Sequence, residues 1–145
     1  MIENYLGFDF GLKRTGVAIG QRITGRARAL GSLRSDDPRL FWKELDRLVQ
    51  EWQPTAFIVG LPLPLEESQT VNPVVLQIER FCQDLGVHFG RPVHTMDECL
   101  STREAESLFR STRSKSSVQF RSVKDEIAAQ LILQSWLDTT SDIVV

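Results

Sequence analysis

Acidic residues occur at three points of this 145-residue sequence where a predicted strand ends or a predicted helix begins. Asp9 interrupts the apolar segment 6–10, Asp97-Glu98 follows the segment 92–96, and Asp125 lies in the first turn of the last predicted helix. Strand interiors disfavour Asp, and burying a carboxylate without a partner costs several kcal/mol. Neighbouring carboxylates also repel one another unless a cation neutralises them. The spacing therefore makes these acids candidates for one metal site.

The chemistry of such a site follows from its oxygen ligands. Carboxylates without Cys or His select hard ions, here Mg²⁺ or Mn²⁺. Two such ions about 3.5–4 Å apart activate a water and stabilise the leaving oxygen in phosphodiester cleavage. Each acid also has a structural explanation. Asp9 can bond a turn amide, Glu98 can be solvated, and Asp125 can complement a helix dipole.

Basic residues are concentrated in two stretches although the net charge is −2. Residues 13–34 hold six Lys or Arg and no acid, and residues 110–124 hold five and no acid. Local basic stretches can hold a phosphate backbone even in a mildly acidic protein. The alternative is that both are ordinary solvated surface.

Composition and length predict one domain over residues 1–145. The hydrophobic fraction of 41% and the charged fraction of 25% are typical of a globular protein. No apolar run approaches the roughly 20 residues of a membrane helix, and no secretory signal is apparent. Cys82 and Cys99 form no ligand cluster, so we expect reduced packing residues of a cytoplasmic protein.

Hydrophobic periodicity predicts an α/β fold. Segments 4–10, 15–21 and 26–33 indicate an antiparallel meander, and two further strands, the apolar run 56–61 and the short segment 92–96, alternate with helices. This order implies a mixed five-stranded sheet, extended by parallel strands, with helices on both faces. Ligand sites of such sheets lie at the carboxyl ends of the parallel strands.

The predicted helices have recognisable ends. Asp37-Pro38 caps the first and Gln53-Pro54 ends it, Gly86 is expected to end the second, and Ser101 with Glu104 forms a capping box for the third. The Ser- and Arg-rich stretch 110–122 predicts a mobile loop. The predicted helices cover residues 41–52, 71–85, 101–109 and 123–137.

Four motifs in order resemble the YqgF family, a bacterial branch of the ribonuclease H-like nucleases related to Holliday junction resolvases. The matching segments are 7–18 (GFDFGLKRTGVA), 58–62 (IVGLP), 97–105 (DECLSTREA) and the helix from Asp125 to Leu137. The resemblance implies a ribonuclease H-like fold and a role in maturing the precursor of small-subunit (16S) ribosomal RNA.

By the same resemblance, Asp9, Glu98 and Asp125 are the metal-binding catalytic acids. Asp97 is held in reserve, because strand alternation sends it and Glu98 to opposite faces. Cys99 departs from the family pattern, since an Arg usually follows the Asp-Glu pair. The segment 64–67 (PLEE) is stiffer and more acidic than the family loop.

Three functions compete. The first is a metal-dependent nuclease in which basic side chains near the acids grip phosphates, with precursor rRNA favoured over a four-way DNA junction as substrate. The second is a nucleic-acid or ribosome-assembly binding protein, on a pre-ribosomal particle, whose catalysis is weak or lost. The third, a phosphotransferase of the sugar-kinase and actin type, needs a second lobe that 145 residues do not accommodate. The expected phosphate-binding residues are Lys13, Arg14, Arg113, Lys115 and Arg121.

Overall fold

The computed structural model describes residues 3–62, 73–97 and 117–143. Five strands form one sheet in the order β3-β2-β1-β4-β5. β1 (Asn4–Asp9), β2 (Arg14–Gln21) and β3 (Arg26–Arg34) form an antiparallel meander. β4 (Ala56–Leu61) runs parallel to β1, and β5 (Val93–Asp97) runs parallel to β4. The predicted mixed sheet is confirmed.

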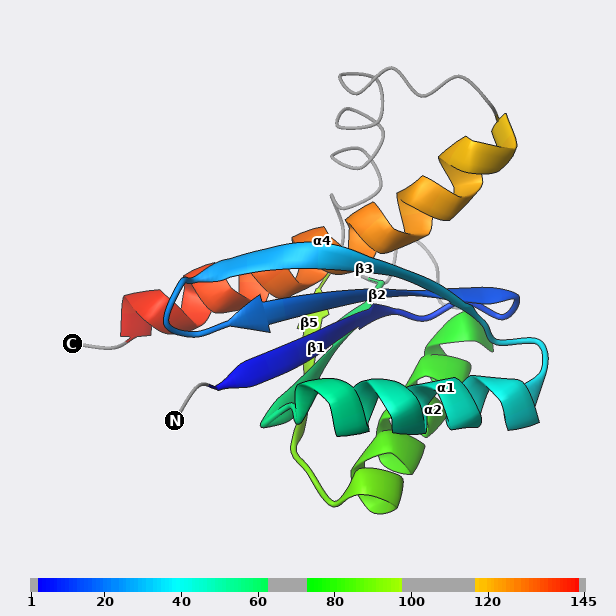
Figure 1. Cartoon of the computed structure of the whole chain (residues 1–145), viewed down its shortest axis with the longest axis horizontal. Coiled ribbons are helices and arrows are strands. Elements are labelled where there is room, and N and C mark those ends of the chain that lie inside the picture. Colours follow the sequence, from blue (N-terminus) through cyan, green and yellow to red (C-terminus); the bar gives the residue numbers. More distant parts are fainter. Residues whose placement is uncertain (1–2, 63–72, 98–116, 144–145) are drawn as a thin grey trace.

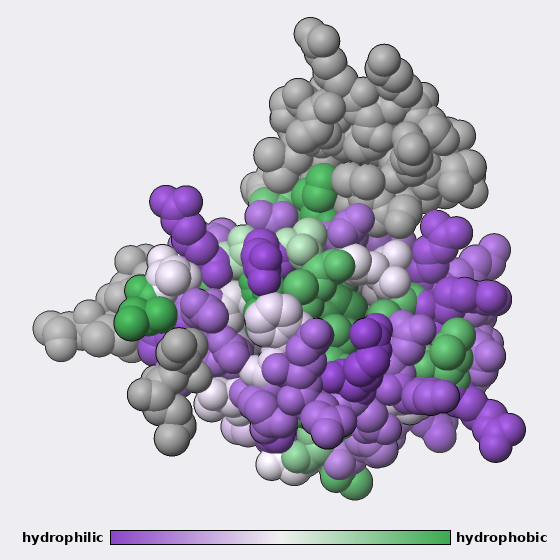
Figure 2. All heavy atoms as spheres, in the orientation of Figure 1, coloured by the Kyte–Doolittle hydropathy of each residue, from purple (hydrophilic) through white to green (hydrophobic). Residues whose placement is uncertain are grey.

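The helices lie on both faces of this sheet. α1 (Pro38–Trp52) and α2 (Pro73–Phe89) cover one face, and the long α4 (Ser117–Ile143) crosses the other (Figure 1). No helix within the described ranges is long and apolar enough to cross a membrane. On the side of the molecule seen in Figure 2, hydrophilic residues predominate, with hydrophobic ones in groups between them.

The ends of α1 follow the predicted capping chemistry. The Asp37 carboxylate accepts a hydrogen bond from the Leu40 backbone N–H at 3.4 Å. Gln53 adopts a left-handed conformation (φ 46°) and its N–H donates to the Val49 carbonyl at 2.8 Å. Both bonds satisfy backbone groups that a helix end otherwise leaves without partners.

Two predicted boundaries are wrong. α2 continues through Gly86 and ends before Gly90, whose φ of 64° and N–H bond to the Gly86 carbonyl form the left-handed stop. α4 begins at Ser117, inside the stretch 110–122 that was expected to be a loop. Arg, Lys and Gln are good helix formers, so a helix anchored by packing further along extends through a polar segment. The expected helix 101–109 lies outside the described residues.

β3 continues through Gly31 to Arg34. The register against β2 shifts between Val17, which pairs with Gly31, and Ala18, which pairs with Ala29. One extra residue, Leu30, is therefore accommodated as a bulge. Gly31 has a φ of 149°, which a side chain would disfavour. The glycine bends the strand without ending it.

The two faces of the sheet pack differently. On the α1/α2 face, Phe8, Phe57 and Leu45 are buried among other large side chains. On the α4 face, glycines and alanines of the strands allow α4 to approach closely. A Cβ built at Gly7 would lie 2.7 Å from the Leu133 Cβ, and one built at Gly20 would lie 2.9 Å from the Leu137 Cδ1. The absence of a side chain at these glycines thus sets the distance between α4 and the sheet.

Two glutamines of α4 fix its position against the edge strand. The Ala27 N–H of β3 donates to Gln134 Oε1 at 2.9 Å, and Gln134 Nε2 donates to the Gly25 carbonyl at 2.8 Å. Gln130 Nε2 donates to the Ala27 carbonyl at 3.2 Å. These side chains satisfy groups that an edge strand leaves unpaired.

Candidate active site

Asp9 is the last residue of β1 and belongs to the α4 face. Tyr5 packs in the cluster that contains α4 residues, and Gly7 lies against Leu133. Side chains alternate along a strand, so Asp9 shares this face. The residue is partly buried. Its partner across the antiparallel pair with β2 is Gly16.

Gly16 lies between Asp9, its strand partner, and Asp125 of α4. A Cβ built at Gly16 would overlap the backbone carbonyl of Asp125, so α4 at Asp125 rests directly on this glycine. Partners in an antiparallel pair have Cα atoms about 4.5–5.5 Å apart. The predicted acids Asp9 and Asp125, 116 positions apart in sequence, are therefore neighbours across one glycine.

The electrostatics at this end of α4 reflect crowded acids. Burial raises the pKa of the Glu126 carboxyl, and the negative charge of the adjacent Asp125 raises it further. Both residues are partly buried. Two carboxyl groups are thus held near one another in a partly desolvated place, where a cation would stabilise their charged forms.

β5 brings Asp97 to the same end of the sheet but directs it to the other face. Leu61 of β4 pairs with Asp97 in the parallel register. Met96 packs into the cluster on the α4 face, and His94 stacks on Trp136 of α4 with ring centroids 5.4 Å apart. By alternation, Asp97 lies on the α1/α2 face, away from Asp9. Glu98, the next residue, lies outside the described residues.

The hairpin after Asp9 is braced by the hydroxyls of Thr15 and Ser35. Thr15 is fully buried, and its Oγ1 lies 2.8 Å from Ser35 Oγ and accepts a bond from the Gly11 N–H at 3.5 Å. The Ser35 N–H donates to the Lys13 carbonyl at 2.8 Å. The turn therefore has a fixed backbone, which positions exposed side chains beside Asp9.

The predicted phosphate-binding residues are only partly placed. Lys13 and Arg14 are exposed and follow Asp9 around this hairpin. Arg121 lies within α4 rather than in a loop. Arg113 and Lys115, like Cys99, lie outside the described residues.

The sequence predicts the acids as site residues but does not show what brings Asp9 and Asp125 together. Gly16 was interpreted only as part of a motif, and its contact with Asp125 depends on a helix far along the chain. Thr15 was likewise not singled out. A signal was present, because Gly7, Gly16 and Gly20 all fall on one face by strand alternation.

The described side chains fit a hard cation in part. Asp9 and Asp125 would offer carboxylate oxygens, the ligands that Mg²⁺ and Mn²⁺ prefer. Within the described ranges, no group of three or more His, Cys, Asp or Glu residues could hold a metal ion. Asp9 and Asp125 alone would leave such a cation in need of further ligands.

Solved structures share this architecture. The fowlpox virus resolvase in complex with Holliday junction DNA superposes with a TM-score of 0.59 at 13% identity, covering 97% of this chain and 99% of that one. The yeast mitochondrial Holliday junction resolvase Ydc2 gives 0.55 at 12% identity, covering 97% and 80%. At such low identity the likeness concerns the fold, which is the ribonuclease H-like fold.

Sequence comparison is more specific. A profile of the RuvX family, described as Holliday junction resolvase, matches residues 3–139. A candidate pre-16S rRNA nuclease of Methylococcus capsulatus is 43% identical over 132 residues, covering 91% of this chain and 86% of that protein. One from Pseudomonas putida is 41% identical over 137 residues, covering 94% and 95%.

The fold and these relatives define a nuclease, a hydrolase of phosphodiester bonds. The chain belongs to the RuvX family, which confirms the resemblance to YqgF proteins.

Proposed function

We propose that this nuclease is divalent-metal dependent and processes the precursor of 16S ribosomal RNA in the cytoplasm, on free RNA or on a pre-ribosomal particle. The observation that carries the catalytic part is the contact of Asp125 with Gly16, the strand partner of Asp9. The names of the curated relatives support the choice of substrate.

The predicted site residues would divide into metal ligands and phosphate contacts. Asp9 and Asp125 would hold Mg²⁺ or Mn²⁺, with Glu98 as the third acidic ligand. When bound, the cation supplies Lewis-acid activation of a water and stabilisation of the leaving oxygen. Lys13 and Arg14 would hold the phosphate backbone beside Asp9, with Arg113, Lys115 and Arg121 as further contacts.

The braced hairpin would orient the substrate. Thr15 and Ser35 fix the turn that carries Lys13, so the ammonium group starts from a fixed backbone position relative to Asp9. Positioning and electrostatic stabilisation account for much of the rate enhancement in such reactions.

A four-way DNA junction is the second candidate substrate, because the matching family profile is described as Holliday junction resolvase. Cutting two strands of a junction requires two active sites. A stable monomer in solution would therefore count against this substrate.

The proposal is tested with wild type, Asp9→Asn and Asp97→Asn on structured precursor RNA, single-stranded RNA and a four-way DNA junction, with Mg²⁺ or Mn²⁺. We expect wild type and Asp97→Asn to cleave the precursor RNA and Asp9→Asn to be at least about 100-fold slower. Asp97→Asn is the matched control, because it removes a carboxylate from the same end of the sheet but the other face. Cleavage that survives in Asp9→Asn would refute the site, and binding without cleavage under either metal would indicate an assembly factor.

A further inference from the structure

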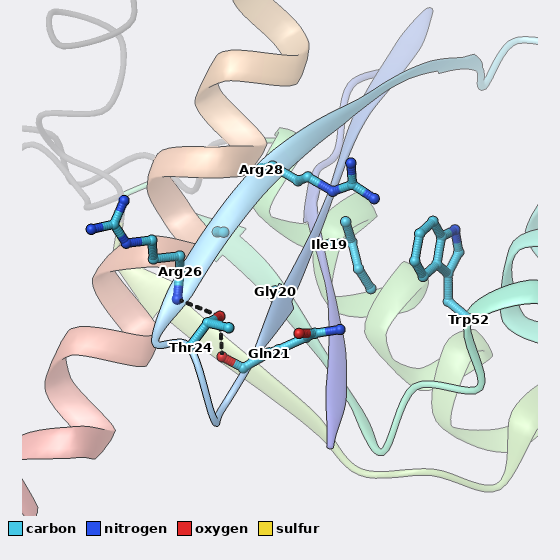
Figure 3. A pocket seen from close by; sticks show the side chains of 8 residues that line it. Ile19, Gly20, Gln21, Thr24, Arg26, Arg28 and Trp52 are labelled. Atoms are coloured by element: carbon cyan, nitrogen blue, oxygen red, sulfur yellow. Dashed lines mark hydrogen bonds between the residues drawn. The ribbon is translucent and has the colours of Figure 1, made fainter. Parts of the chain in front are cut away.

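A hollow of about 430 Å³ lies at the opposite end of β2 from Asp9 (Figure 3). It occupies the junction between the β2–β3 hairpin and the end of α1. Gln21 is five positions after Gly16 in β2, which is about 17 Å of strand. A ligand in this hollow is thus well separated from the candidate active site. The main lining side chains are Ile19, Gln21, Thr24, Arg26, Arg28 and Trp52.

The chemistry of the lining suits an anion attached to a flat apolar group. Arg28 points toward Trp52, and its guanidinium carbon lies 5.5 Å from the indole centroid (Figure 3). Arg26 extends in the other direction from the start of β3, away from Trp52 (Figure 3). No acid lines the hollow among the described residues.

The surrounding backbone keeps the hollow open. The Thr24 hydroxyl donates to the Gln21 carbonyl at 3.4 Å and accepts from the Arg26 N–H at 3.3 Å. Gln134 anchors the same hairpin through the Gly25 carbonyl. A preorganised wall lowers the entropy that a ligand must lose on binding.

We propose that this hollow binds a nucleotide of single-stranded RNA away from the cleaved bond. Arg28 contacts a phosphate, and the base packs against the accessible part of the Trp52 indole, which is only partly buried. Such combinations of basic groups and aromatic rings bind single strands with little sequence preference. The volume is within the usual range of small-molecule sites and accommodates one nucleotide. The inference rests on the proposed function only for the identity of the RNA.

The test measures RNA binding separately from cleavage. A fluorescein-labelled 20-nucleotide single-stranded RNA is titrated by anisotropy with protein carrying Asp9→Asn, which prevents cleavage. Arg28→Glu, Arg28→Lys and Trp52→Leu are compared with Arg47→Glu, which makes the same charge change at an exposed position of α1 outside the hollow.

We expect Arg28→Glu to raise the Kd at least about fivefold near 0.1 M salt and to reduce the salt slope by about 0.7 for each lost phosphate contact. Trp52→Leu should raise the Kd at least about fivefold through lost base packing. Arg28→Lys should retain most of the affinity, and Arg47→Glu should change it less than about twofold.

Equal effects of Arg28→Glu and Arg47→Glu would overturn the inference, as would no effect of Arg28→Glu. The two proposals fail separately. Wild type that cleaves RNA while Arg28→Glu binds normally refutes the hollow alone. Arg28-dependent binding by a protein that cleaves nothing refutes the nuclease proposal alone.

Discussion

The two faces of the sheet are built from residues of different size. The α1/α2 face packs large rings, such as Phe8 edge-on to Phe81 with centroids 5.5 Å apart. The α4 face presents Gly7, Gly16 and Gly20, which leave space for a helix backbone. Large side chains bury apolar area, whereas small ones let backbones approach. The aromatic face should therefore determine stability, and the glycine face should determine the geometry of Asp9 and Asp125.

Gly16→Ala should have the largest effect on activity. The new methyl group would overlap the Asp125 carbonyl and push α4 away from β2. A displacement near 1 Å can lower a rate about 100-fold. Cleavage kinetics under saturating substrate would measure the loss. Gly86→Ala on α2 is the control, because its Cβ would make only ordinary van der Waals contacts, with Val93 Cγ2 at 3.7 Å and the Arg91 carbonyl oxygen at 3.9 Å. Equal kcat in Gly16→Ala and wild type would contradict the claim that the glycine face determines the geometry of Asp9 and Asp125.

Leu45→Ala should affect stability but not catalysis. Leu45 is fully buried on the aromatic face, and losing such a side chain costs about 2–5 kcal/mol. Urea unfolding would show a lower midpoint, while kcat of the folded fraction stays that of wild type. A kcat that falls as much as in Gly16→Ala would mean that the faces are not separable.

Gln134→Leu should lower both the stability and the activity, each by a smaller amount. It leaves the Ala27 N–H without its acceptor and removes the bond to Gly25, which costs about 1–3 kcal/mol. Because Gln134 anchors α4, kcat should also fall by a few-fold. Gln50→Leu, at an exposed position of α1, should stay within about 0.5 kcal/mol of wild type. A Gln134→Leu protein as stable as wild type would show that the anchor is dispensable.

The smallest expected effect is on the alkylation rate of Cys82 on α2, which Gly16→Ala should leave unchanged. Burial raises the pKa of its thiol to about 11, with the negative Glu79 nearby adding to the rise. The thiolate is the reactive form, so iodoacetamide at pH 8 should modify Cys82 about 100-fold more slowly than in the urea-unfolded chain. Peptide mass spectrometry separates Cys82 from Cys99. The slow rate should be unchanged in Gly16→Ala, because that change disturbs the other face. Faster labelling there would show that both faces loosen together.

The fold could be predicted from the sequence where local patterns decide it. The meander, the buried parallel strand β4 and the Asp37 cap of α1 all follow from alternation, apolar runs and capping residues. The start of α4 could not, because tertiary packing of residues such as Ala129 and Leu133 stabilises a helix whose polar beginning resembles a loop.

In the candidate site, too, local patterns predict some features and tertiary packing decides others. Residue type and motif predict Asp9 and Asp125 as site residues, since one interrupts an apolar strand and the other lies in the first turn of a predicted helix. Their proximity depends on a close contact between Gly16 and a helix more than 100 residues away, which no local pattern encodes. Likewise, the face of Asp97 follows only from the packing of Met96 and His94.

Mn²⁺ binding, followed by electron paramagnetic resonance, tests most directly whether Asp9 and Asp125 form one cation site. Each of Asp9→Asn and Asp125→Asn should weaken binding at least about tenfold, because hard cations depend on the charge of their oxygen ligands. Asp97→Asn, which changes the opposite face, should bind Mn²⁺ as wild type does. Unchanged Mn²⁺ affinity in Asp9→Asn, or an equal loss in Asp97→Asn, would contradict the account.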